Sequence, residues 1–90
     1  MNTTASEAIS ISSLIVGAQP AKAAAVRASL GTLAGVEVHA VTEDGRMIVT
    51  VEAASDDATV QAFETIRRLP GVLSAAMVYH RYESDPDGEV

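Results

Sequence analysis

The 90-residue chain has no cysteine, no tryptophan and only three aromatic side chains, which are Phe63, Tyr79 and Tyr82. Without cysteine the chain can form no disulfide, cysteine-bound zinc, iron–sulfur cluster or thiolate nucleophile. Because aromatic residues are so few, the core must be built from valine, isoleucine and leucine, with the 16 alanines allowing close contacts. The apolar content of 48% is too high for a disordered chain and is sufficient for one small domain.

Basic residues are also scarce, since six lysines and arginines face twelve acids and the formal net charge is −6. Four of the acids lie in residues 83–90, which leaves a charge of −2 for residues 1–82. This balance disfavours nucleic acid as a partner, because a phosphate backbone would be repelled. A cationic partner is compatible with it.

Long hydrophobic runs are missing as well. The longest uncharged stretch, Ala8–Ala21, has 14 residues, whereas a membrane-spanning helix needs about 20 mostly apolar ones. The first ten residues contain no lysine or arginine, which a secretory or twin-arginine signal would require. We therefore expect a cytoplasmic protein without stable membrane insertion.

The hydrophobic periodicity predicts two helices and four strands in the order βαββαβ. The expected strands cover residues 9–16, 36–41, 46–53 and 72–82, and the expected helices cover residues 20–33 and 56–69. This order predicts an α+β, ferredoxin-like split βαβ fold, with a four-stranded antiparallel sheet and two helices on one face. We expect a single domain over residues 9–82, a flexible N-terminus (1–8) and a flexible acidic tail (83–90).

Two helices on one face leave the other face of the sheet bare, and the alternation of side chains predicts what this face carries. The expected binding residues on it are Ser12, Leu14, Val16, Glu37, Ile48, Thr50, Glu52, Ser74, Ala76 and Val78. The same alternation predicts that His39, Val41 and His80 point outward as well. The residues predicted to point into the core include Ile11, Ile15, Ala40, Leu73, Ala75, Met77 and Tyr79.

The predicted face has an apolar centre, with carboxylates toward one side at Glu37 and Glu52. Covering about 300 Å² of apolar surface would contribute about 7 kcal/mol before the cost of association. An exposed apolar patch of this size usually marks a site for a partner. The alternative interpretation is homodimerisation through the sheet, so a weak homodimer is compatible with the sequence.

No set of residues in the sequence points to catalysis. The two histidines, His39 and His80, have no second ligand at metal-binding spacing, and Ser12 and Ser13 have no identifiable base. The expected strands lack the central aromatics with which RNA-recognition domains stack bases. We therefore expect a binding protein that is not an enzyme and that uses no metal or other cofactor.

Four segments together resemble the NapD family, the small assembly chaperones of periplasmic nitrate reductase. They are Ser13–Val16, Gly35–Val38, Gly45–Ala53 and Gly71–His80. The resemblance covers residues 9–82 and includes the element order and a glycine before the second and fourth strands. It implies a cytoplasmic chaperone that binds the twin-arginine signal peptide of the molybdenum-containing catalytic subunit and delays export until the cofactor is inserted.

The sequence leaves the binding mode open. The peptide could lie as an amphipathic helix on the bare face, with its arginines at Glu37 and Glu52, or add as a strand to a sheet edge. The alternative function is an ACT-like small-molecule-sensing or dimerisation module.

Overall fold

The computed structural model describes residues 9–83 and contains four strands and two α-helices within them. The strands are β1 (Ile9–Ala18), β2 (Val36–Val41), β3 (Arg46–Ala53) and β4 (Val72–Glu83). The helices are α1 (Ala23–Leu30), which follows the 3₁₀ turn η2 (Pro20–Lys22), and α2 (Asp56–Arg67). The predicted flexible ends, residues 1–8 and 84–90 of the tail, lie outside the described residues.

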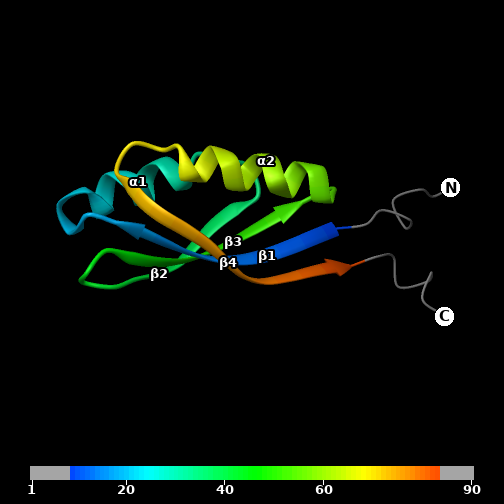
Figure 1. Cartoon of the computed structure of the whole chain (residues 1–90), viewed down its shortest axis with the longest axis horizontal. Helices are drawn as coiled ribbons and strands as arrows, with labels where there is room; N and C mark the ends of the chain where they lie inside the picture. The colour runs from blue at the N-terminus through cyan, green and yellow to red at the C-terminus, as the bar shows by residue number, and fades with distance from the viewer. Residues whose placement is uncertain (1–8, 84–90) are drawn as a thin grey trace, which may run out of the picture.

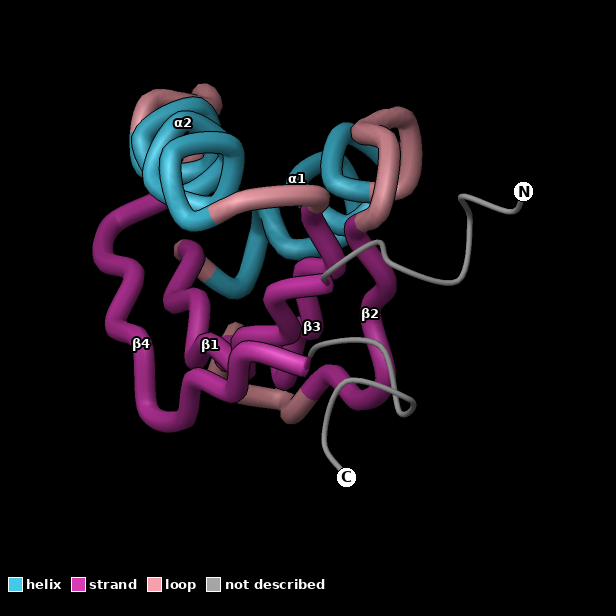
Figure 2. The backbone as a smooth tube through the Cα atoms, turned by 90° about the vertical axis from the view of Figure 1, so that its right-hand side faces the viewer, coloured by secondary structure: helices cyan, strands magenta, loops and turns pink. Residues whose placement is uncertain are grey.

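The sheet has the strand order β2-β3-β1-β4, and every neighbouring pair is antiparallel. Both helices lie on one side of it, so that in the described part of the chain the opposite face has no helix over it (Figures 1 and 2). The predicted ferredoxin-like fold is thus confirmed. Neither helix of residues 9–83 has the length and apolarity needed to cross a bilayer.

Local sequence signals account for the helix boundaries. The Ser55 hydroxyl caps α2 by accepting a hydrogen bond from the Ala58 N–H (3.0 Å), and two aspartates follow in the first turn, where the helix dipole favours them. The first helix is shorter than the predicted 20–33. It ends at Leu30, because the Gly31 and Thr32 N–H groups close the last turn on the Arg27 and Ser29 carbonyls.

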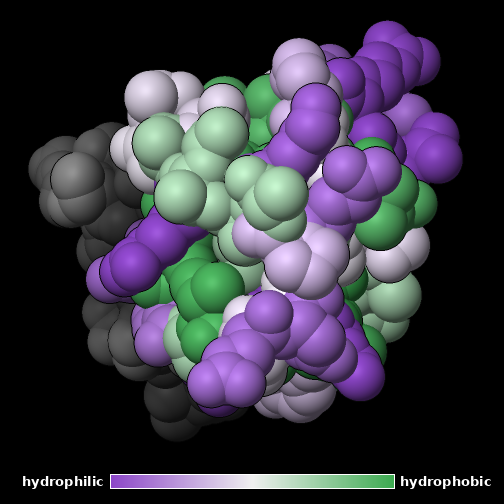
Figure 3. Space-filling model, turned by 90° about the vertical axis from the view of Figure 1, so that its left-hand side faces the viewer, coloured by the Kyte–Doolittle hydropathy of each residue, from purple (hydrophilic) through white to green (hydrophobic). Residues whose placement is uncertain are grey.

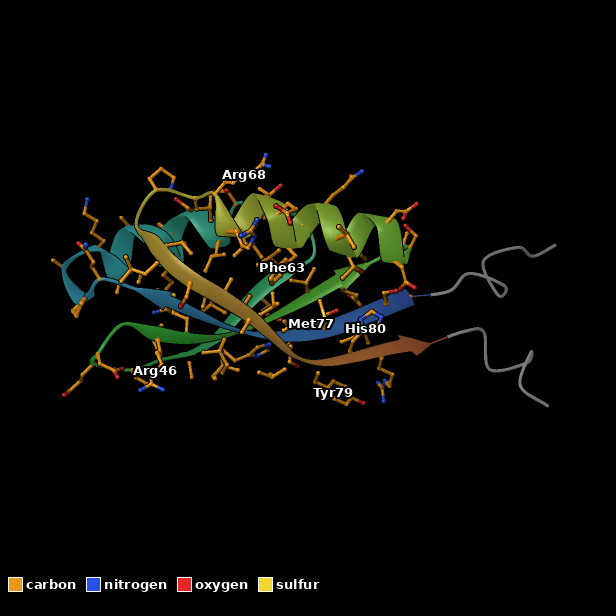
Figure 4. The ribbon with its side chains drawn as sticks, viewed as in Figure 1. Arg46, Phe63, Arg68, Met77, Tyr79 and His80 are labelled. Carbon is orange, nitrogen blue, oxygen red and sulfur yellow. The ribbon has the colours of Figure 1, made fainter. Side chains whose placement is uncertain are left out.

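The core lies between the helices and the sheet. Its fully buried members come from every element except β2, η2 and β4, and are Leu14, Val16, Ala18, Val26, Leu30, Met47, Val49, Val51 and Ile66. Phe63 of α2 points down onto the sheet (Figure 4). As expected from the composition, aliphatic side chains therefore form nearly all of the core.

Strand β1 has the opposite orientation to the prediction. Ser12, Leu14 and Val16, predicted on the bare face, are buried under the helices with exposures of 0%, 1% and 0%. They pair with core residues of β3, so Ile11 and Ile15 point to the bare face instead. The prediction is wrong because it kept polar residues out of the core, whereas the buried serines of β1 have hydrogen-bond partners there.

Strand β4 departs from simple alternation at two register shifts, one at Leu73 and one at Val78. Leu73, predicted in the core, is 65% exposed. After Val78 the faces are reversed, so that Tyr79 points away from the helices and His80 points toward them (Figure 4). Both are corrections to the prediction, which assumed an unbroken strand.

A third register shift corrects the end of β2. It lies between Val38 and Ala40, and it places Ala40 opposite Ile48 and Val41 opposite Met47. Ala40 therefore belongs to the bare face and Val41 to the helix side, the reverse of the prediction.

Gly45 in the β2–β3 turn is a position that only glycine fits. Its φ is +91°, and a Cβ there would lie 2.0 Å from the Ala18 carbonyl oxygen. We expect Gly45→Ala to lower the free energy of unfolding by roughly 2–4 kcal/mol, measured by urea denaturation. The control is Gly31→Ala, where φ is −67° and the nearest atom is 3.5 Å from the added carbon. Equal losses for the two variants would contradict this account.

Candidate functional site

The face of the sheet without helices, the open face, is organised in rows, because paired residues on neighbouring antiparallel strands point to the same side. One row is apolar and takes one residue from each strand. In the order β2-β3-β1-β4 it consists of Ala40, Ile48, Ile15 and Ala76. This set, called here the apolar row, crosses the whole sheet. On the β4 side, the exposed side chains of Val78 (61%) and Tyr79 (53%) extend its apolar surface.

The next row is polar and contains the first carboxylate. Glu37 pairs with Thr50, which pairs with Ser13, which in turn lies opposite Tyr79. His39 Nε2 lies 2.7 Å from Thr50 Oγ1 and 4.0 Å from Glu37 Oε1. The Glu37 side chain is 75% exposed, so it remains accessible to a partner.

The third row has an acidic residue at its β3 end and a basic residue at its β4 end. It runs from Glu52 on β3 through Ile11 on β1 to Arg81 on β4. Glu37 and Glu52 therefore both lie on the β2–β3 side, whereas Arg81 lies on the β4 side.

Arg46 also belongs to this face, and its charge is neutralised locally. Its guanidinium lies 3.1 Å from Asp44 Oδ2 in the β2–β3 turn. Hydrogen bonds from the Thr42 hydroxyl and the Arg46 guanidinium hold the pKa of Asp44 below its ordinary value. At this end of the molecule hydrophilic side chains surround smaller hydrophobic patches (Figure 3). The chain's single lysine, Lys22, lies in η2 and away from the sheet face.

Seven of the ten predicted site residues lie on the open face, if Val78 at the second register shift of β4 is included. They are Glu37, Ile48, Thr50, Glu52, Ser74, Ala76 and Val78. The other three, Ser12, Leu14 and Val16, belong to the core. Ile11, Ile15, Ala40 and Tyr79 lie on the open face although their predicted side was the core. No local signal in the sequence identifies them, since they depend on the phase of β1 and on the register shifts.

A hydrogen-bond network on the helix side links β1, β4 and α2. The Ser10 hydroxyl donates to Asp56 Oδ1 (2.9 Å), His80 Nε2 lies 3.3 Å from the same oxygen, and Ser12 Oγ lies 2.8 Å from His80 Nδ1. The order serine–histidine–aspartate is that of hydrolase triads, but Ser12 is fully buried, so a substrate cannot reach its hydroxyl. The network satisfies the buried serines and fixes β1 with Ser12 toward the helices.

We expect His80→Leu to destabilise the fold by about 1–3 kcal/mol, because the buried Ser12 hydroxyl would lose its partner. Adding Ser12→Ala removes that hydroxyl, so the double variant should lose less than the sum of the two single losses. His39→Leu is the matched control, since it removes an exposed hydrogen bond and should cost less than about 0.5 kcal/mol. Urea denaturation measures all four variants, and equal losses for the two histidines would contradict the assignment.

Within residues 9–83 no three histidine or carboxylate side chains come together as metal ligands. Every buried side-chain nitrogen or oxygen of these residues has a hydrogen-bond partner. In the described part of the chain the open face is the candidate site, because its apolar row and the carboxylates beside it suit an apolar and cationic partner.

Comparison with known proteins identifies the family and agrees with the fold. Residues 9–84 match the family model described as NapD protein. The chain is 35% identical over 75 residues to Chaperone NapD of Escherichia coli K12, covering 81% of this chain and 85% of that protein. It is 38% identical over 71 residues to Chaperone NapD of Paracoccus pantotrophus, covering 79% of this chain and 62% of that protein. It is also similar to the solution structure of the E. coli Tat proofreading chaperone protein NapD, with a TM-score of 0.76, 31% identity, and coverage of 81% and 78% of the two chains.

Proposed function

Because the chain belongs to the NapD family of chaperones, we propose that its open face binds the twin-arginine signal peptide of the catalytic subunit of periplasmic nitrate reductase. Such a peptide has a basic segment with two arginines, followed by a moderately apolar segment. The chaperone acts in the cytoplasm, where this subunit is made. Its binding to the peptide delays export until the cofactor of the subunit has been inserted.

The observation that carries this proposal is the apolar row with carboxylates to one side of it. The row spans three strand spacings, about 14 Å, which equals the length of about ten helical residues. This length suits an apolar peptide segment that lies across the strands as a helix. The row has no charged member, so covering it desolvates no ionic group.

The distribution of charge favours one direction for the peptide. Glu37 and Glu52 lie on the β2–β3 side, and each can accept charge-assisted hydrogen bonds from a guanidinium group. On the β4 side the exposed residues Val78 and Tyr79 extend the apolar surface. We therefore place the apolar segment along the apolar row and the basic segment beyond its β2–β3 end, beside Glu37 and Glu52.

The similarity to a protein described as a Tat proofreading chaperone supports the choice of partner. The test is an NMR titration of the full chain with a twin-arginine peptide, followed through backbone amide shifts. We expect the largest shifts at the apolar row and at Glu37, Thr50 and Glu52. A peptide in which lysines replace both arginines is the control, because an ammonium cannot form the bidentate contact with a carboxylate. Shifts confined to α1 and α2 would overturn the site assignment.

A further inference from the structure

Strand β4 forms an outer edge of the sheet that is long and apolar. It has 12 residues, whereas β2 at the other edge has six. Between residues 72 and 79 it contains no charged residue, and Leu73 and Val78 stand out at the two register shifts with exposures of 65% and 61%. Sheets protect exposed edges with charges, prolines, bulges or short strands. The shifts bend β4, but the four residues between them remain regular and uncharged.

The apolar surface continues from this edge onto α2, which lies above β4 (Figure 2). Two shallow hollows on the outer flank of this helix meet at Val60, which is 58% exposed. One hollow is lined by Val60 together with Glu64, Arg68 and Leu69, among others. The other lies between α2 and β4 and is lined by Asp56, Thr59, Val60, Met77 and His80.

The two ends of this flank differ in net charge, although Glu64 lies at the basic end and pairs there with Arg67 (2.9 Å) and Arg68 (3.9 Å). Helix α2 runs antiparallel to β4 (Figure 1). Its acidic start, Asp56 and Asp57, lies beside the second half of β4, where His80 contacts Asp56. Its basic end, Arg67 and Arg68, lies beside the first residue of β4, Val72. The Arg68 side chain is 79% exposed (Figure 4).

We propose that a second copy of this chain docks on the flank formed by β4 and α2. A two-fold axis near Ala76 would pair β4 with β4 of the second copy in antiparallel fashion. The same axis sets the two α2 helices antiparallel, so that the acidic start of each helix faces the basic end of the other. Val60, Leu73 and Val78 are then covered between two sets of ion pairs.

Charge complementarity selects a second copy over a cationic peptide as the occupant. A basic peptide along this flank would meet Arg67 and Arg68 at one end, whereas a two-fold copy places an opposite charge at both ends. The dimer joins two sheets at β4. It covers Val78 at the β4 border of the open face and leaves Ile48, Glu37 and Glu52 of both copies accessible.

The charge pattern is tested by sedimentation equilibrium of the full chain from micromolar to millimolar concentration. We expect a reversible dimer, and we expect Asp57→Arg and Arg68→Glu each to raise its dissociation constant at least about tenfold. The double variant Asp57→Arg/Arg68→Glu restores opposite charges at both ends, so it should dimerise like the original chain. A monomer over the whole range, or a double variant weaker than both single ones, would overturn the proposal. Thermal unfolding checks that every variant folds.

The edge is tested with lysines at three exposed positions. Leu73→Lys should raise the dissociation constant of the dimer at least about tenfold, because the ammonium groups would be brought to one interface. Val41→Lys on the β2 edge and Ile48→Lys on the open face should leave it unchanged. A dimer that is disrupted by either control, or that tolerates Leu73→Lys, would show that another surface forms the contact.

Discussion

Lysine in place of Ile48 should weaken the binding of a twin-arginine peptide at least about 100-fold. Ile48 lies in the apolar row between Ala40 and Ile15 and is 38% exposed before binding. Full burial of an isoleucine contributes about 1.5–3 kcal/mol, and covering the exposed part of Ile48 contributes a share of this. Lysine would replace that gain with a hydrated cation that also repels the arginines. Isothermal titration calorimetry measures the dissociation constant directly.

The control for this variant is Ala28→Lys, which adds the same charge on the exposed side of α1. Its affinity should stay within about twofold of the original chain, because screening by salt removes most long-range repulsion. If both lysines weaken binding equally, the effect comes from net charge, and the open face is not the binding site.

Reversing the charges of Glu37 and Glu52, as Glu37→Lys/Glu52→Lys, should weaken the binding of the same peptide about 10- to 100-fold. The physical reason is the loss of charge-assisted hydrogen bonds to the guanidinium groups, together with new repulsion. The double variant should also lose most of the salt dependence of binding. A peptide with glutamines in place of its arginines should bind the variant and the original chain almost equally, which assigns the effect to the arginines.

The matched control for the two carboxylates is Glu43→Lys/Asp57→Lys, which makes the same change in net charge in the β2–β3 turn and at the start of α2. Its affinity should differ little from that of the original chain. A loss as large as that of the Glu37/Glu52 variant would mean that the two carboxylates of the open face have no specific role.

The order of elements could be predicted from the sequence because each carries a local signal. The β2–β3 hairpin was predicted with mostly correct faces, since Glu37 and Glu52 mark the polar side by their charge and Asp44-Gly45 marks the turn. The sequence also indicates the start of α2, because Ser55 precedes two aspartates and caps the helix. Such signals depend only on residues close in sequence, so they can be recognised in a single amino-acid sequence.

The orientation of β1 could not be predicted in the same way. Its ten residues contain no charge and are apolar on both sides, so their alternation has two solutions of similar hydrophobicity. The orientation is fixed by hydrogen bonds of the buried serines to residues far away in the sequence. Ser10 bonds to Asp56, 46 residues away, and Ser12 to His80, 68 residues away. No periodicity within β1 carries that information.

Register shifts limited the prediction for the outer strands. At Val78 in β4 and after Val38 in β2 one extra residue reverses the faces that follow. Tyr79 consequently lies on the open face, and Ala40 joins the apolar row.

Membership of the NapD family decides between the functions considered from the sequence, in favour of a chaperone over an ACT-like module.

Alternation has an evolutionary consequence for this sheet. On β1 the core residues Leu14 and Val16 flank Ile15, which faces outward, so folding and recognition depend on neighbouring but separate positions. If the open face binds the signal peptide as proposed, substitutions there can change recognition at little cost in stability. The bulges are the exceptions, because a deletion there would exchange interior and exterior along the rest of the strand.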